Sequence, residues 1–215
     1  MADNKTVVFK GTVFDVIEGT DGRGRLRHGI KCPDWACVIP VLPDGRLVMV
    51  EQVRWGTREP SLEAPGGCVD EGENGAEGAR RECEEETGYT ARDVLPLGWV
   101  HPNPAHQDNR FHMYLAYIAG VQGAQRLDDS ERVNVRIMSQ AQVRDAIDTG
   151  RMTHALHIVA IERALKALRT VRLPIVTCAC PIESHVCWYD SELGVKDPRI
   201  CTCCDKCSDA CYQDT

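Results

Sequence analysis

Length, composition and charge limit what this chain can be before any motif is considered. It has 215 residues, a mass of 23.9 kDa, a formal net charge of −7 and a pI near 5.5. Nucleic acids and anionic membranes are polyanions, so this charge argues against both as partners. No apolar run reaches about 18 residues, which argues against a membrane-spanning helix. Residues 1–5 lack the apolar core of a signal peptide, so we expect a cytoplasmic protein.

The cysteines divide the chain into two parts. Eight of the 12 cysteines lie within residues 178–211, where large apolar residues are few. Such a segment cannot build a conventional core of its own. We therefore expect a globular domain over residues 1–174 and a small Cys-rich C-terminal appendage over residues 175–215.

Apolar residues that alternate, or run continuously between turn signals, predict strands. The first segment indicates one strand or a bulged pair of strands around Gly11. Residues 26–32 alternate apolar with mainly basic side chains, which predicts a half-buried strand with a basic outer face. Pro43-Asp44-Gly45 predicts a hairpin turn. The predicted strands cover residues 6–17, 26–32, 36–42, 46–53, 98–101, 111–118 and 133–137.

Three segments have the spacing of helices, namely residues 75–87, 140–149 and 153–169. Ser139 and Gln142 have the spacing of a capping box at the start of the second helix. Strands and helices are intermixed without regular βαβ repeats. We therefore predict an α/β fold, an α/β/α sandwich with a mixed sheet.

The most informative stretch is residues 63–89, EAPGGCVDEGENGAEGARRECEEETGY. At about 100° per residue, Glu82, Glu85 and Glu86 share one face of the predicted helix. Three carboxylates that close repel one another unless a cation lies among them, and their oxygens suit Mg²⁺ or Mn²⁺. Arg81 can pair with Glu85, four residues later. The alternative is a solvated acidic helix face.

This stretch resembles the Nudix box, G-x5-E-x7-R-E-U-x-E-E-x-G-U, where U is a bulky aliphatic residue. All seven non-U positions match, and the two U positions hold Cys83 and Tyr89. The resemblance implies a Nudix fold and metal-assisted hydrolysis of a nucleoside diphosphate linked to another moiety. It implies supporting roles for Arg81 and Glu73. The metal ligands that it implies are Glu82, Glu85, Glu86 and the carbonyl of Gly66.

Three further features are similar to ADP-ribose pyrophosphatases. These are Glu51-Gln52-Val53-Arg54, the Leu62–Gly67 segment, and Pro104 fifteen residues after Tyr89. Asn103-Pro104-Ala105 departs from the Ser-Pro-Gly usual there, which favours a related nucleoside-diphosphate sugar over ADP-ribose itself. The substrate that the resemblance implies is therefore ADP-ribose or a related nucleoside-diphosphate sugar. The resemblance also implies a homodimer that shares its N-terminal strands. The substrate-binding residues predicted in this way are Arg54, Trp55, Glu63 and Pro104.

The roles of several residues outside the box remain open. Arg54 can fork onto phosphate oxygens or form a surface salt bridge. Trp55 can stack on adenine or shield the sheet as a rim aromatic. Glu131, with Asp129 second, is the candidate general base on a late loop, and the alternative is that both are turn residues.

The cysteines of the appendage favour metal over disulfides, because no secretory signal is present. Cys178, Cys180, Cys204 and Cys207 are the candidate ligands of Zn²⁺. The alternatives are an iron–sulfur cluster on the C-x2-C-x2-C-x3-C spacing from Cys201, or a disordered, redox-active or disulfide-bonded tail. For the whole chain, the alternative to an enzyme is a Nudix-fold nucleotide sensor or a metal- or redox-sensing module without turnover.

Overall fold

The computed structural model of the chain describes residues 5–118, 120–127, 132–170, 175–177 and 186–188. Its contacts separate two units, Met1–Ala164 and Leu165–Thr215. In the second unit, β11 (Ile175–Thr177) and β12 (Val186–Trp188) pair antiparallel. The domain division predicted after residue 174 stays a prediction. Within the described ranges, no helix is long and apolar enough to cross a lipid bilayer.

A seven-stranded mixed sheet forms the centre of the first unit. Its main path runs β10-β5-β4-β9-β8, while β6 pairs with β5 and β7 pairs with β4. β4 and β9 run parallel, and the other pairs in this sheet are antiparallel. The strands are β4 (Trp35–Val41), β5 (Leu47–Val53), β6 (Pro60–Glu63), β7 (Gly66–Cys68), β8 (Val94–Val100), β9 (Phe111–Tyr117) and β10 (Val133–Met138).

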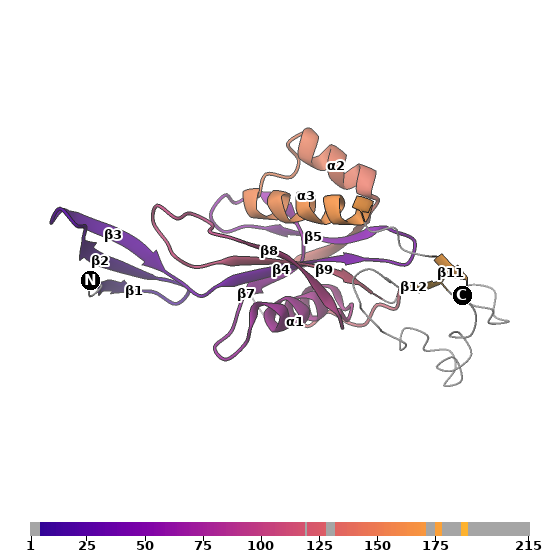
Figure 1. Cartoon of the computed structure of the whole chain (residues 1–215), viewed down its shortest axis with the longest axis horizontal. Coiled ribbons are helices and arrows are strands. Elements are labelled where there is room, and N and C mark those ends of the chain that lie inside the picture. Colours follow the sequence, from indigo (N-terminus) through magenta and orange to yellow (C-terminus); the bar gives the residue numbers. More distant parts are fainter. Residues whose placement is uncertain (1–4, 119, 128–131, 171–174, 178–185, 189–215) are drawn as a thin grey trace. The chain divides into compact units, whose positions relative to one another are not determined.

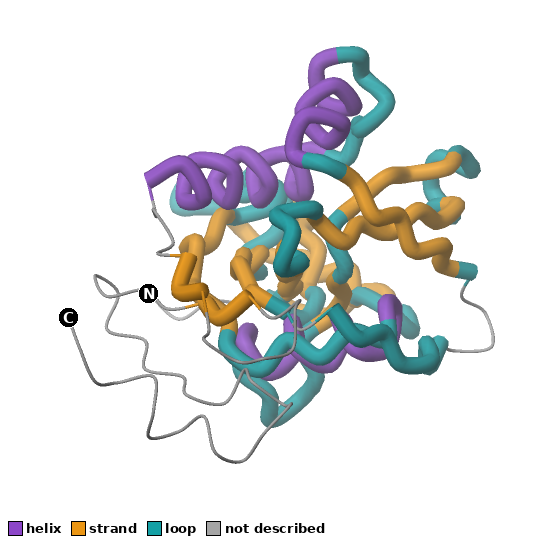
Figure 2. The backbone as a smooth tube through the Cα atoms, turned by 90° about the vertical axis from the view of Figure 1, so that its right-hand side faces the viewer, coloured by secondary structure: helices purple, strands orange, loops and turns teal. Residues whose placement is uncertain are grey.

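Helices cover both faces of this sheet (Figures 1 and 2). The helix α1 (Gly75–Thr87) lies on one face, and α2 (Gln140–Asp148) lies on the other. The part of α3 (Ala155–Thr170) up to Ala164 lies on the same side as α2. This arrangement confirms the predicted α/β/α sandwich with a mixed sheet. The buried cluster that includes α1 consists of Ala36, Val38, Leu42, Val48, Ala79, Cys83, Tyr89, Ala91, Ala116 and Ile118.

The three predicted helices are confirmed, each to within two residues at its ends. The sequence did not predict β6 and β7, because both strands are short and Pro65 interrupts the segment between them. It also placed the start of β8 four residues too late. Pro96 weakens the strand signal there, and the β8–β9 register shifts between Pro96 and Gly98.

The N-terminal strands form a separate antiparallel sheet of β1 (Thr6–Lys10), β2 (Asp15–Thr20) and β3 (Leu26–Lys31). The predicted bulged pair is confirmed, with a register shift between Val7 and Phe9. The prediction that β3 is half-buried is wrong for its first half, since Leu26 is 57% exposed. Alternation identifies a strand, but it does not say whether another part of the same chain covers it. The exposed apolar residues of this region are Val7, Val8, Phe9, Val13, Phe14 and Leu26.

Capping side chains mark the starts of α1 and α2, and a glycine with positive φ lies at or just after the end of each helix. Asn74 caps α1 in a capping box with Glu77, and Ser139 forms the predicted box with Gln142 on α2. The α1 helix ends at Gly88, whose φ of 74° is left-handed. Gly150, just after α2, has nearly the same φ of 73°. A Cβ on Gly88 would overlap the carbonyl oxygen of Gly123, whereas a Cβ on Gly150 would meet no atom within 4 Å.

We predict that Gly150→Ala lowers the stability by about 1 kcal/mol, roughly 2–4 °C in Tm, because it strains the left-handed backbone alone. Gly88→Ala adds a steric clash and lowers stability by roughly 1–3 kcal/mol more. Thermal unfolding of the two variants, matched in φ, measures the difference. Equal losses of Tm would contradict the packing role of Gly88.

Candidate active site

Arg81 joins the loop before α1 to the carboxylates on that helix. Its Nη2 donates to the carbonyl of Cys68 at 2.8 Å, and its Nε donates to Glu73 at 3.0 Å. Its Nη1 lies 3.0 Å from an oxygen of Glu82 and 3.0 Å from an oxygen of Glu85. These hydrogen bonds from Arg81 hold the pKa of the Glu73 carboxyl below its ordinary value. One guanidinium thus fixes loop and helix together, and the pair expected with Glu85 is present.

Glu86 contacts the same loop from a more buried position. It is 4% exposed, and its Oε2 accepts the backbone N–H of Gly66 at 2.8 Å. A Cβ on Gly67 would lie 2.7 Å from Cδ of Glu82, so a larger residue at this position would push the carboxylate out of its present place. Glu82 and Glu86 therefore lie against β7, and Arg81 links Glu85 to the same strand.

The two departures from the Nudix consensus are accommodated by packing. Cys83 is 0% exposed and Tyr89 is 4% exposed, and both belong to the apolar cluster between α1 and the sheet. Burial raises the pKa of the Cys83 thiol to about 12, so this side chain behaves as a small apolar group. Both residues fill the places that aliphatic residues fill in the consensus.

Arg54, which directly follows β5, and Glu63, the last residue of β6, form an ion pair. Nε of Arg54 donates to one oxygen of Glu63 at 2.8 Å, and Nη2 donates to the other. Burial would raise the pKa of Glu63, but the hydrogen bonds and the charge of Arg54, together with the other groups around the carboxylate, lower it further, and the pKa falls to about 2. Glu63 is fully buried whereas the Arg54 side chain is 40% exposed, so the salt bridge is not a surface pair. The adjacent Trp55 is 81% exposed.

Sequence reasoning missed His157 and His154. Nδ1 of His157 accepts the backbone N–H of Ala64 at 3.2 Å, and its Nε2 lies 3.4 Å from Oε2 of Glu63. Potential ligand atoms of Glu63, His154 and His157 lie within 4.8 Å of one another. Burial lowers the pKa of His157 to about 3, so its ring is neutral. The signal was available: two histidines three residues apart in a predicted helix, although nothing local indicates their partners.

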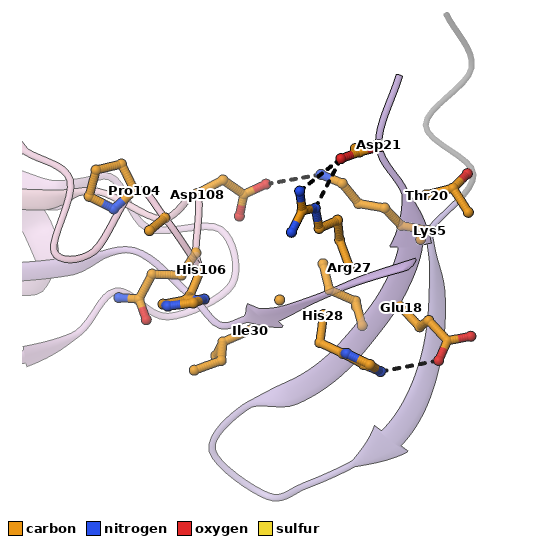
Figure 3. A pocket seen from close by; sticks show the side chains of 15 residues that line it. Lys5, Glu18, Thr20, Asp21, Arg27, His28, Ile30, Pro104, His106 and Asp108 are labelled. Atoms are coloured by element: carbon orange, nitrogen blue, oxygen red, sulfur yellow. Dashed lines mark hydrogen bonds and ion pairs between the residues drawn. The ribbon is translucent and has the colours of Figure 1, made fainter. Parts of the chain in front are cut away.

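The remaining predicted residues lie elsewhere. Pro104 lines a cavity of about 260 Å³ between the loop that contains it and the β2–β3 strands (Figure 3). Arg27 pairs with Asp21 there, and Lys5 lies 3.9 Å from Asp108. No box residue lines this cavity. Glu131 and Asp129, and the cysteines Cys178, Cys180, Cys204 and Cys207, lie outside the described residues.

The sandwich fold, with an Arg81-centred carboxylate cluster on α1, defines a class of protein. The family model of the NUDIX domain matches residues 33–156, and the chain belongs to this family. The protein is a Nudix hydrolase of the ADP-ribose pyrophosphatase-like type. A crystal structure of an ADP compounds hydrolase shares this fold, with a TM-score of 0.65 and 21% identity. The match covers 78% of this chain and 92% of that one.

Curated relatives differ in their activities. The ADP-ribose pyrophosphatase of Bacillus subtilis is 29% identical over 177 residues, which cover 76% of this chain and 94% of that protein. The methanol dehydrogenase activator of Bacillus methanolicus is 28% identical, over 72% of this chain and 86% of its own length. A CMP-5′-(N-acetyl-N-hydroxy-3-aminopropyl)phosphonate hydrolase of Streptomyces rubellomurinus is 32% identical, over 63% of this chain and 65% of that protein.

We predict that the buried histidine makes stability depend on pH. The unfolded chain protonates His157 near its ordinary pKa of 6.5, whereas the folded chain keeps it neutral down to about 3. The free energy of unfolding therefore falls as pH drops from 6.5 toward 3, by up to about 1.4 kcal/mol per pH unit. Denaturant titrations between pH 7 and pH 4 measure this slope. His157→Asn should reduce it, while the exposed control His28→Asn should keep it. An unchanged slope in His157→Asn would contradict the assignment.

Proposed function

We propose that the protein hydrolyses the pyrophosphate bond of ADP-ribose or a related nucleoside-diphosphate sugar. The products are a nucleoside monophosphate and a sugar phosphate. The observation that carries the proposal is the cluster in which Arg81 and Gly66 gather the three box glutamates against one loop. The names of the relatives in Bacillus subtilis and Escherichia coli, both ADP-ribose pyrophosphatases, support the choice of substrate.

The donor set of this cluster fits a hard divalent cation, Mg²⁺ or Mn²⁺. All its donors are oxygens, from the carboxylates of Glu82, Glu85 and Glu86 and from the carbonyl of Gly66. Arg81 donates hydrogen bonds to two of these carboxylates, those of Glu82 and Glu85. Carboxylates this close repel one another, and a bound cation would relieve that repulsion further. Once bound, the cation would polarise the phosphoryl group of the substrate and lower the pKa of a water bound to it.

The other residues would bind and orient the substrate. Arg54, held by Glu63, would direct its guanidinium at phosphate oxygens. Trp55, with its exposed ring, would stack on the base, and Pro104 would shape the wall of the sugar or nucleoside site. Glu131 would accept a proton from the attacking water as general base. Arg81 would keep the ligand carboxylates in place.

We predict that purified protein releases AMP from ADP-ribose only when Mg²⁺ or Mn²⁺ is added. Glu86→Gln keeps the shape but removes the charge, and it should lower kcat about a thousandfold, the effect of several kcal/mol of lost charge stabilisation. Glu84→Gln is the matched control on the same helix, because Glu84 pairs with Arg126 outside the cluster.

A wild type as inactive as Glu86→Gln on a panel of nucleoside diphosphate derivatives would refute the enzyme proposal. Nucleotide binding in calorimetry without turnover would support the sensor instead. Elemental analysis of the same preparation tests for zinc in the Cys-rich tail, which stays a prediction.

We also propose a homodimer built through the N-terminal sheet. The exposed apolar side chains of that region support it, because water-exposed patches of this kind mark protein contacts. The cavity beside Pro104 lacks the box residues within one chain, which fits a substrate site completed by a second copy.

We predict that Phe9→Asp converts the dimer to a monomer, because it places a charge in the proposed contact. Light scattering after size exclusion measures the mass. Val121→Asp is the control, since Val121 is an equally apolar, 80% exposed residue outside the N-terminal sheet. A monomeric wild type, or a Phe9→Asp variant that remains dimeric, would contradict the proposed contact.

A further inference from the structure

We propose that His157 is a positioning residue of this enzyme: its neutral ring holds the segment that crosses from β6 to β7 and thereby sets Arg54 and Gly66. The proposal rests on the hydrolase activity proposed above. His157 lies on α3, 93 residues along the chain from its partner Ala64. Its ring is almost fully buried and packs edge-on against Phe111, with ring centres 5.5 Å apart.

The crossing segment needs outside support because it changes strand partners. β6 pairs with β5 up to Glu63, and β7 pairs with β4 from Gly66 onward. Between them, the N–H of Ala64 is buried, and Pro65 has no N–H. A buried donor left unpaired is costly, so the Ala64 N–H needs an acceptor. Nδ1 of His157 is that acceptor.

Two layers of the sandwich therefore hold the segment from opposite sides. From the α3 side, His157 accepts the N–H of Ala64. From the α1 side, the carboxylate of Glu86 accepts the N–H of Gly66. The carbonyl of Gly66, proposed above as a metal ligand, lies on the same short stretch of backbone. Its position depends on both contacts and on the pairing of this stretch with β4, where Val38 donates its N–H to the carbonyl of Pro65.

The hydrogen bond at Nδ1 also settles the tautomer of His157. An Nδ1 that accepts an N–H carries no hydrogen, so the neutral ring carries its hydrogen on Nε2. That Nε2–H faces Oε2 of Glu63 at 3.4 Å. Oε2 of Glu63 is thus shared by Nε2 of His157 and Nη2 of Arg54, while Nε of Arg54 donates to Oε1. The ring orients the carboxylate that orients the arginine.

The same tautomer argues against reading Glu63, His154 and His157 as a metal site. A metal on Nε2 of His157, with Nδ1 still accepting from Ala64, would require a fully deprotonated imidazolate. Histidine ligands instead donate a hydrogen from the nitrogen that does not bind the metal. Arg54 also occupies both oxygens of Glu63. The three side chains form a support for the loop.

The test compares three substitutions of His157. His157→Asn keeps an acceptor near the place of Nδ1, His157→Gln keeps a polar group near the place of Nε2, and His157→Leu keeps neither. Ile161→Val is the control, because it removes a methyl group from a fully buried residue of α3 one turn after His157 and leaves the imidazole in place. Steady-state kinetics on ADP-ribose and amide hydrogen exchange at Ala64 are measured for each.

We expect His157→Leu to raise KM about tenfold, the effect of leaving the buried N–H of Ala64 without its acceptor. kcat should stay within about threefold, because Arg54 would contact the phosphates in both ground and transition states. Exchange of the Ala64 amide should accelerate in His157→Leu and in His157→Gln. His157→Asn should restore its protection, and Ile161→Val should leave both readouts unchanged.

Two outcomes would overturn the proposal. One is a folded His157→Leu variant with the KM and the Ala64 exchange of the wild type. The other is an Ile161→Val variant with the same rise in KM, since general loosening would then explain it. If the wild type turns over no nucleoside diphosphate, the proposed function fails by itself. Exchange at Ala64 then still decides whether His157 holds the segment.

Discussion

Repulsion among carboxylates is the constraint on which the rest of this site depends. Glu73, Glu82 and Glu85 converge on one guanidinium, and Arg81 meets all three while also binding the carbonyl of Cys68. Without a cation at that point, the loop and the helix would repel each other. The Arg81 pairing therefore allows the acidic face of α1 to lie against the turn before it. A site rich in acidic side chains is stable in the free protein for the same reason.

A second constraint comes from the sheet. The polypeptide leaves β5 as its partner at Glu63 and joins β4 at Gly66. At the crossing, the carbonyl of Pro65 accepts the N–H of Val38 at 3.1 Å, but the N–H groups of Ala64 and Gly66 need side-chain acceptors. His157 and Glu86 supply the acceptors, one from each helical layer. The proposed metal and phosphate contacts thus lie at a place where the fold itself requires polar groups.

Local patterns in the sequence predicted the helices well, because their period and caps are contained within a few residues. The box is equally local, so Arg81 and the glutamates could be placed on one helix face with no structure. The residues that sequence reasoning missed have distant partners. His157 finds Ala64 only after the sandwich forms, and nothing near residue 157 indicates this. The sequence allows Arg54 either a phosphate contact or a surface salt bridge, since the burial of Glu63 depends on tertiary packing. The same limit explains the exposed start of β3.

The parallel pairing of β4 with β9 has a consequence for how the protein is made. Trp35 lies opposite Phe111, and His157 follows later still, so the central pairing joins distant parts of the chain. Contacts of long sequence separation form late, because loop closure must come first. During synthesis α1 emerges well before α3. The N–H of Ala64 therefore lacks its acceptor until His157 has left the ribosome. The sequence of α1 is therefore synthesised before His157, whose ring holds the segment between β6 and β7. Nascent or truncated chains that end before α3 would carry the whole Nudix box without a finished site.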